Sequence, residues 1–376
     1  MTDSPVQQPA AAAPVARLVG LDSIRFLCAA IVVFAHTGQP PLRNGIDTTH
    51  PIGRLVDAGL ANIWSSAAAV IVFFVVSGFC IHHAYAERNR IGSLSEYYVR
   101  RYVRILIPAI GAILISAAIG LNLSLFEDSI LWSIAAEIIY YTIYPALLPL
   151  RRRLGSWLPL IGIAFVLAFA VAGSRPHEAE YPMFGLQLNW LLGLPCWLLG
   201  CWLADLAASG RVWRLASFVW PLRLAAWSAM IGCSILRYHT PIGYPWTLNL
   251  FAILAALWLG AETAYLSRHP PPRWLEWCGR WSYSLYLTHK LTNQAIGWLS
   301  PPTLGPVLDW SLRFGLLLLG AYVFYLACEK PAHGLARRAG RWAAGLGATA
   351  NGAPPPAASP QPALATVRQA DSSLSK

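Results

Sequence analysis

The sequence has little of the charge that keeps a soluble protein in water. Asp, Glu, Lys and Arg make up only 12% of its 376 residues, whereas a typical soluble domain has about 25%. Hydrophobic residues account for 56% of the chain, and the mean hydropathy is +0.48. This composition excludes a soluble enzyme with one anchor, and it predicts a polytopic membrane protein.

The sequence also lacks the motifs of several common kinds of site. None of its seven cysteines lies in an expected external loop, so a disulfide framework is excluded. No Cys/His cluster has zinc-finger spacing, and no phosphate-loop or dinucleotide glycine motif occurs, so we expect no metal and no bound cofactor. The net charge of +11 is explained below by membrane topology, and no nucleic-acid partner is expected.

Both ends of the chain are low in complexity. Residues 1–17 are rich in proline and alanine, and they lack the basic start and cleavage site of a signal peptide. The end of the chain reads "NGAPPPAASPQPALATVRQADSSLSK". We therefore expect disordered tails at 1–17 and 345–376, and one membrane domain over residues 18–340.

Ten apolar runs have about the length that a helix needs to cross a membrane. They begin near Gly20, Leu60, Tyr102, Ser129, Trp157, Leu186, Leu222, Thr247, Arg280 and Gly305. The run over 156–173 is short, and the run over 280–300 is polar for a membrane span. The predicted fold is an all-α bundle of about ten transmembrane helices.

An even number of spans places both termini on one side, and the basic residues decide which side. Of the 28 Lys and Arg residues, 21 fall in the termini and loops on that side, four fall in the opposite loops, and three fall inside apolar runs. In membrane proteins the cytoplasmic loops carry the excess of basic residues. We therefore expect both termini in the cytoplasm and the protein in the cytoplasmic (inner) membrane.

The first apolar run, "GLDSIRFLCAAIVVFAHTG", carries ionisable residues near both ends. Arg25 lies near its cytoplasmic end and His36 near its external end. The helix between them makes about three turns and rises about 16 Å, so both side chains lie on one face. A face shared by two such residues indicates a common cavity. The alternatives are an arginine that reaches back to the interface and an interfacial histidine without a role.

A second cluster, "YYVRRYVRILIP", begins the third apolar run. Arg101 and Arg104 are at positions i and i+3, so they point the same way on a helix. Two guanidinium groups side by side suit an anion with several phosphates, because each can donate two parallel hydrogen bonds. The alternative is ordinary cytoplasmic charge, or contact with anionic lipid head groups.

Two further runs carry polar residues that lipid would not tolerate. Glu137 lies about two turns into the fourth run, and Ser133 precedes it by one turn on the same face. The segment "WSYSLYLTHKLTNQ" carries serines, a histidine, a lysine and two amides. Such residues line a protein interior or a wet cavity. For Glu137, the alternative is a structural partner of another buried polar group.

Six blocks of the sequence resemble, in this order, acyltransferase family 3, whose members are integral-membrane proteins that O-acylate extracellular sugars. The blocks are "LDSIRFLCAAIVVFAHTG", "VFFVVSGFCI", "RRYVRILIP", "LWSIAAEIIYYTIYP", "WSYSLYLTH" and "ACEKPAHGLARR". Each block is weak alone, but six in sequence, together with the number of spans, are specific. The resemblance covers about residues 18–340.

The resemblance implies transfer of an acyl group, expected to be acetyl, from cytosolic acyl-CoA to a hydroxyl of a glycan or lipid-linked sugar. His36 is the expected general base, with Glu137 orienting it or stabilising its charge, and an acyl-His36 intermediate is the alternative. Arg25, Arg101 and Arg104 are expected to bind the CoA phosphates. The expected supporting residues of the cavity are Asp22, Ser133, Tyr283, His289 and Glu329.

A multi-span transporter of a glycolipid or organic anion is the rival interpretation, because buried charges and many spans also suit a carrier. The sequence shows no internal repeat and no pair of Gly/Pro-interrupted spans, which favours the enzyme. In either case membrane lipids are expected partners.

Overall fold

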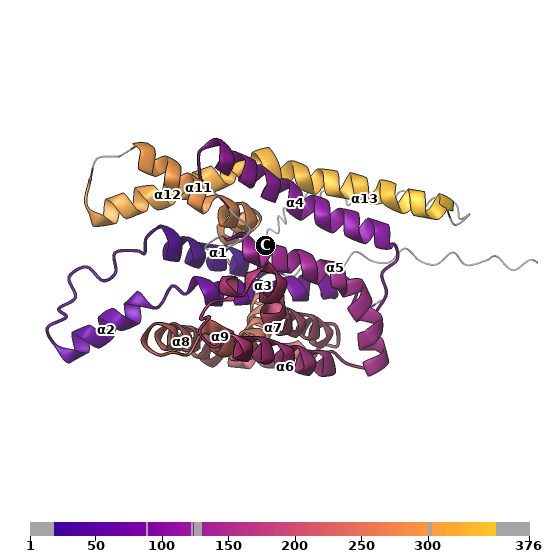
Figure 1. The fold of residues 1–376 in the computed structure, drawn as a ribbon, viewed down its shortest axis with the longest axis horizontal. Coiled ribbons are helices and arrows are strands. Elements are labelled where there is room, and N and C mark those ends of the chain that lie inside the picture. Colours follow the sequence, from indigo (N-terminus) through magenta and orange to yellow (C-terminus); the bar gives the residue numbers. More distant parts are fainter. Residues whose placement is uncertain (1–18, 88, 122, 124–129, 300–302, 351–376) are drawn as a thin grey trace, which may run out of the picture.

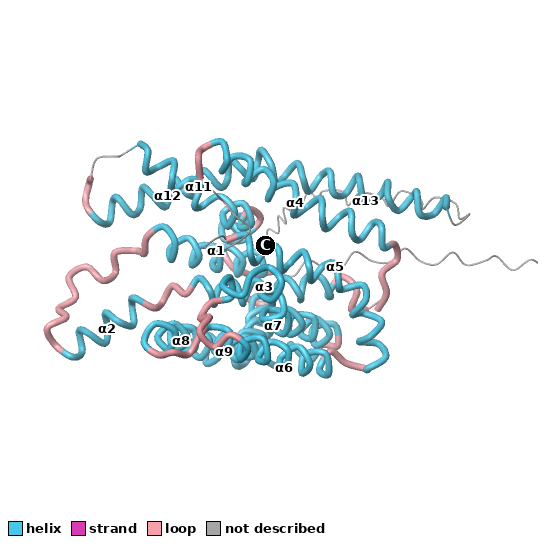
Figure 2. Tube along the Cα trace, viewed as in Figure 1, coloured by secondary structure: helices cyan, strands magenta, loops and turns pink. Residues whose placement is uncertain are grey.

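The structure is a computed structural model that describes residues 19–87, 89–121, 123, 130–299 and 303–350 (Figure 1). In that part of the chain the backbone forms helices joined by loops, with no strand (Figure 2). The predicted tail over 1–17 lies outside the described residues, as does the C-terminal tail after Ala350. The last helix ends at Ala350, so it includes the first residues of that predicted tail.

The described elements are helices and short helical turns. The α-helices are α1 (Leu21–Thr37), α2 (Pro51–Ala61), α3 (Ser66–His83), α4 (Leu94–Ala118), α5 (Leu131–Leu154), α6 (Leu158–Ser174), α7 (Gly185–Ala208), α8 (Val219–His239), α9 (Tyr244–Leu266), α10 (Arg273–Gly279), α11 (Ser282–Leu299), α12 (Pro306–Phe324) and α13 (Lys330–Ala350). Short 3-10 turns precede α7 (Tyr181–Phe184) and α8 (Arg211–Phe218). A π-turn, Tyr325–Glu329, joins α12 to α13 as one continuous helix.

The helices follow the apolar runs of the sequence. Seven helical segments of the described chain are long and apolar enough to cross a membrane, and they contain α3, α4, α5, α7, α8, α9 and the continuous α12–α13. The remaining predicted spans are helical too, but α1 and α6 have only 17 residues each. Helix α11 carries polar residues along its length. The all-helical membrane fold is confirmed, and the count of ten spans stays a prediction.

Helix α3 lies in the middle of the molecule (Figure 1). Most of its residues are apolar and buried, as expected of a helix surrounded by protein. It packs closely on α7 through two glycines, because a Cβ atom at Gly78 would lie 1.9 Å from the Trp197 carbonyl oxygen, and one at Gly200 would lie 2.0 Å from that of Val75. Small residues let two helix backbones approach in this way. The close contact fixes α3 against its neighbour.

Helix α10 holds the N-terminus of α1. The Glu276 carboxylate accepts hydrogen bonds from the backbone N–H groups of Gly20 and Ser23 (3.1 Å each) and from the Ser23 hydroxyl (2.6 Å). A carboxylate at this place satisfies free N–H groups and suits the positive end of the helix dipole. The contact anchors the end of α1 that carries Asp22 and Arg25.

Helices α4 and α13 run side by side along one edge of the molecule (Figure 1). The Ser95 hydroxyl of α4 donates a hydrogen bond to the Ala343 carbonyl oxygen of α13 (3.1 Å). Gly340 of α13 approaches Arg100 so closely that a Cβ atom would lie 2.3 Å from the Arg100 Cγ atom. Helix α13 therefore supports the helix that carries the predicted arginine pair.

Candidate active site

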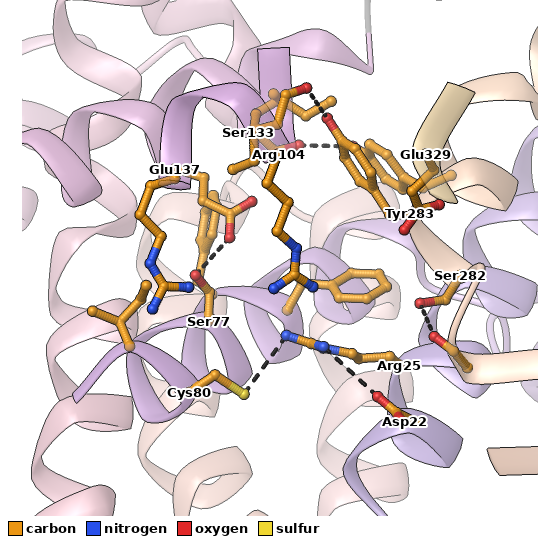
Figure 3. Close-up of a pocket in the computed structure, with 18 of the residues that line it drawn as sticks. Asp22, Arg25, Ser77, Cys80, Arg104, Ser133, Glu137, Ser282, Tyr283 and Glu329 are labelled. Carbon is orange, nitrogen blue, oxygen red and sulfur yellow. Dashed lines mark hydrogen bonds and ion pairs between the residues drawn. The ribbon is translucent and has the colours of Figure 1, made fainter. Parts of the chain in front are cut away.

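A cavity of about 540 Å³ lies among α1, α3, α4, α5, α11 and the start of α13 (Figure 3). Its walls carry many ionisable side chains for the interior of a membrane protein. These are Asp22, Arg25, Arg101, Arg104, Glu137, Arg280, Glu329 and His333. In Figure 3 the guanidinium groups of Arg25 and Arg104 point into the same space. The cavity therefore holds side chains of both charge signs within a membrane protein.

The predicted arginines have few anionic partners in this cavity. Arg25 Nη1 lies 3.8 Å from Asp22 Oδ1, near the limit of an ion pair. The Arg101 guanidinium carbon lies 5.9 Å from the centre of the Tyr141 ring. Among the described residues, neither Arg101 nor Arg104 has a carboxylate within the 4.0 Å of an ion pair. Arg101 is half-buried and Arg104 is exposed toward this space, so their guanidinium groups can donate hydrogen bonds to an anion.

Two carboxylates of the cavity are held by neutral donors instead. Glu137 accepts hydrogen bonds from the hydroxyls of Ser77 (2.6 Å) and Tyr141. Glu329 accepts hydrogen bonds from the backbone N–H (3.1 Å) and the hydroxyl (2.5 Å) of Ser284. Glu329 also lies 3.6 Å from His333 Nε2, and none of these hydrogen bonds or ion pairs of the two carboxylates uses Arg101 or Arg104.

His36 and His289 form a pair in which the hydrogen bonds assign the protons. His289 Nδ1 lies 2.7 Å from the Tyr286 carbonyl oxygen, which only accepts, so this nitrogen carries a proton. In a neutral ring, His289 Nε2 is then an acceptor, and it lies 3.1 Å from His36 Nδ1. His36 Nδ1 therefore donates, and His36 Nε2 keeps a free lone pair. His289 is fully buried and His36 is exposed, as an oriented base requires.

A smaller cavity of about 350 Å³ lies at the His36 end of α1. Its aromatic and charged lining residues, besides His36 and Tyr286, are Trp132, Glu180, Tyr181, Tyr244 and Lys290. It shares two lining residues, Val70 and Tyr286, with the larger cavity. The sequence indicated one cavity for Arg25 and His36. The structure instead gives them two adjoining cavities, because Val70 and Tyr286 lie between the spaces that the two ends of α1 face.

Comparison with known families identifies the kind of domain that the chain forms. A family model described as an acyltransferase domain matches residues 18–330, which is most of the chain. The chain belongs to acyltransferase family 3. Together with the apolar helices, this makes it a membrane acyltransferase. No curated protein and no solved structure matches the chain.

Most residues that the sequence predicts for the site of this acyltransferase meet in the larger cavity. They are Asp22, Arg25, Arg101, Arg104, Ser133, Glu137, Tyr283 and Glu329. His36 and His289 lie together, with His36 at the smaller cavity. The structure thus gathers the predicted residues into two neighbouring groups, and their catalytic and binding roles stay predictions.

The sequence does not give the distance between Glu137 and His36. In the structure Glu137 lines the larger cavity with the arginines, and His289 makes the contact with His36. The reason is the packing of α5 on α3, where the Glu137 carboxylate meets the Ser77 hydroxyl. In this acyltransferase the partner that orients His36 therefore comes from α11.

Arg280, His333 and Tyr286 are among the lining residues of the acyltransferase cavities that the sequence did not single out. Arg280 and His333 line the larger cavity, but each follows the pattern of ordinary cytoplasmic charge beside an apolar run. Tyr286 lines both cavities, and its carbonyl oxygen holds His289. Its position three residues before His289 is the one available signal, because that spacing puts both residues on one helix face.

Proposed function

We propose that this acyltransferase moves an acyl group, expected to be acetyl, from a cytosolic acyl-CoA to a hydroxyl of a glycan or lipid-linked sugar. The observation that carries the proposal is the charge of the larger cavity. Arg101 and Arg104 have no carboxylate partner among the described residues, while neutral donors hold Glu137 and Glu329. The phosphates of CoA would supply the missing anions.

The proposal includes a topology. In it, α1, α6 and α11 cross the inner membrane together with the seven apolar segments, and both termini lie in the cytoplasm. The support is the distribution of basic residues, with 21 Lys and Arg on the terminal side and four in the opposite loops. The arginine end of α1 then faces the cytosolic donor, and His36 lies toward the external side.

The donor would lie along α1. Its phosphates would contact Arg101, Arg104 and Arg25 in the larger cavity. The helix between Arg25 and His36 rises about 16 Å, which an extended pantetheine arm covers in large part. The thioester would then reach the boundary between the two cavities, and the acceptor would enter the smaller one.

The chemistry follows from the tautomers of the histidine pair. His36 Nε2 would take the proton of the acceptor hydroxyl as its oxygen attacks the thioester carbonyl carbon. The carbon–sulfur bond breaks, the new ester bond forms, and the CoA thiolate then receives the proton from His36. Meanwhile His289 would hold the imidazolium through the His36 Nδ1–H. The alternative step, in which His36 itself carries the acyl group, uses the same lone pair.

The decisive experiment is transfer of labelled acetyl from acetyl-CoA by the purified protein in lipid vesicles. The acceptor is a glycan fraction of the same membranes, and His36→Ala is the matched inactive variant. We expect label in the glycan fraction with wild type only. If the donor or the glycan crosses the vesicle membrane chemically unmodified and no new ester forms, the protein is a transporter instead. Mass spectrometry of surface glycans from cells with and without the gene would then identify the acceptor.

A further inference from the structure

Two residues stand between the larger and the smaller cavity. Val70 of α3 and Tyr286 of α11 are the side chains that line both spaces. Both are largely buried, with exposed fractions of 6% and 7%. A group that moves directly from the arginine cavity to the cavity at His36 therefore meets these two side chains, which border both spaces.

Tyr286 is held in a fixed position in this wall. Its hydroxyl lies 2.8 Å from the Ser133 hydroxyl and donates a hydrogen bond to the Ile130 carbonyl oxygen (2.9 Å). The edge of the Phe73 ring packs against its ring, with 6.1 Å between the ring centres. Because its backbone carbonyl also holds His289, this residue joins the wall to the histidine pair. A tyrosine with these contacts does not move aside easily.

Val70 has no such polar anchor, but its backbone is fixed. Helix α3 packs on α7 through Gly78 and Gly200, where neither backbone leaves space for a Cβ atom. Helix α3 therefore cannot move away from Tyr286, and the volume of the side chain at position 70 sets the width of the gap between the two residues. A substitution at Val70 therefore changes the width of this gap, while Tyr286 on the other side stays held by its contacts.

We propose that Val70 and Tyr286 form the passage through which the acyl group reaches His36, and that the size of Val70 limits the acyl chain length. This inference rests on the proposed transfer from acyl-CoA. In that reaction the acyl group is the leading end of the donor, so it meets the passage before the thioester does. Acetyl, with one methyl group, needs the least space, whereas each added methylene must fit between the two side chains.

The step itself is the one described above, and the passage changes only which donors complete it. The thioester carbon–sulfur bond breaks, the ester bond to the acceptor oxygen forms, and the acceptor proton reaches the CoA thiolate by way of His36. A side chain at the passage affects the position of the acyl carbon, not the phosphates that the arginines would bind. Variants of Val70 should therefore separate transfer from donor binding.

The test uses the purified full-length protein with acetyl-, butyryl- and hexanoyl-CoA as donors. Val70→Ala should raise the rate of butyryl relative to acetyl transfer at least about tenfold, the size of effect that one or two methylenes produce in an apolar pocket. Val70→Phe should lower acetyl transfer at least about tenfold. Both variants should bind acetyl-CoA within about twofold of wild type. The matched control is Ile105→Ala, which enlarges only the larger cavity and should leave the butyryl-to-acetyl ratio unchanged.

Each outcome decides one question. Acetyl-CoA binding reports whether each variant is folded, and if Val70→Phe fails this check, the Val70→Ala ratio decides alone. An active wild type with a Val70→Ala ratio like that of Ile105→Ala would overturn the passage and leave the proposed function standing. A wild type that transfers no acyl group from any donor would overturn the proposed function itself.

Discussion

Arg104 offers a way to distinguish a ligand-binding arginine from a structural one. Its side chain points into the larger cavity, and no carboxylate of the described residues pairs with it. Hydrogen bonds to charged groups contribute about 1.5–3 kcal/mol, and about 1.4 kcal/mol corresponds to a tenfold change in Kd. Arg104→Gln should therefore weaken acetyl-CoA binding about 10- to 150-fold.

The same substitution should not lower the stability of the ligand-free protein. The Arg104 side chain is exposed, and its loss leaves no described carboxylate without a partner, so the free energy of unfolding should stay about equal. Arg104→Lys should rescue donor binding poorly, because an ammonium group does not reproduce the two parallel hydrogen bonds of a guanidinium. This combination of weaker binding and retained stability is the signature of a site prepared for an anion.

Arg223→Gln is the matched control, because Arg223 has the partner that Arg104 lacks. Its Nε and Nη2 donate hydrogen bonds to Glu262 (2.8 and 2.6 Å), and the Glu262 side chain is only 8% exposed. Neither residue lines a cavity described above. Arg223→Gln should lower the free energy of unfolding by about 1.5–3 kcal/mol, allowing for the solvent that reaches the arginine, with donor affinity unchanged.

The assay is equilibrium titration of acetyl-CoA into wild type and variants in lipid nanodiscs, with thermal unfolding followed by tryptophan fluorescence. Two results would refute the reasoning. One is a wild-type Kd in Arg104→Gln, which would return this arginine to a role in topology or lipid contact. The other is a loss of stability in Arg104→Gln as large as that in Arg223→Gln, which would show a structural partner.

Four further substitutions test three more residues of the two cavities. His36→Ala should lower turnover about 10²- to 10⁴-fold with acetyl-CoA affinity retained, and near wild-type turnover would remove it from the mechanism. His289→Ala should lower turnover and alter the pH profile of turnover. His289→Gln should retain more activity, because its amide oxygen can accept a hydrogen bond from the His36 Nδ1–H. Equal losses of activity in both variants would show that His289 acts through packing alone. Glu137→Gln should change the KM for acetyl-CoA more than the pH dependence of kcat. A larger change in the pH dependence of kcat would instead show that the Glu137 carboxylate acts on His36.

The sequence predicts the helices well, because apolar runs of membrane length leave few other structures open to the backbone. Each of the ten runs contains a helix, including the polar run that becomes α11. Helix α2 was not predicted, because it lies in a polar segment between two apolar runs. The sequence also does not predict that α13 continues the last run, since its apolar residues give way to arginines and glycines.

The site is predictable as a set of residues but not as an arrangement. Intramembrane charge and hydroxyl groups mark the residues, since lipid excludes them. Helical spacing gives the face on which Arg25 and His36 lie, but it does not give the helix that packs against that face. The His36–His289 contact joins residues 253 positions apart, and only the packing of α1 on α11 brings them together.

The π-turn between α12 and α13 fixes the rotational phase of the C-terminal helix. Such a turn holds one residue more than an α-helical turn, so every residue after Glu329 is rotated about 100° from its place in an uninterrupted helix. With this phase, Gly340 meets Arg100 where the helices are closest, and His333 reaches the larger cavity. If the turn became a regular α-helical turn with all its residues kept, Gly340 would rotate about 100° away and a bulkier neighbour would face Arg100. The damage would then appear on α4, at the arginine pair, rather than at the turn itself.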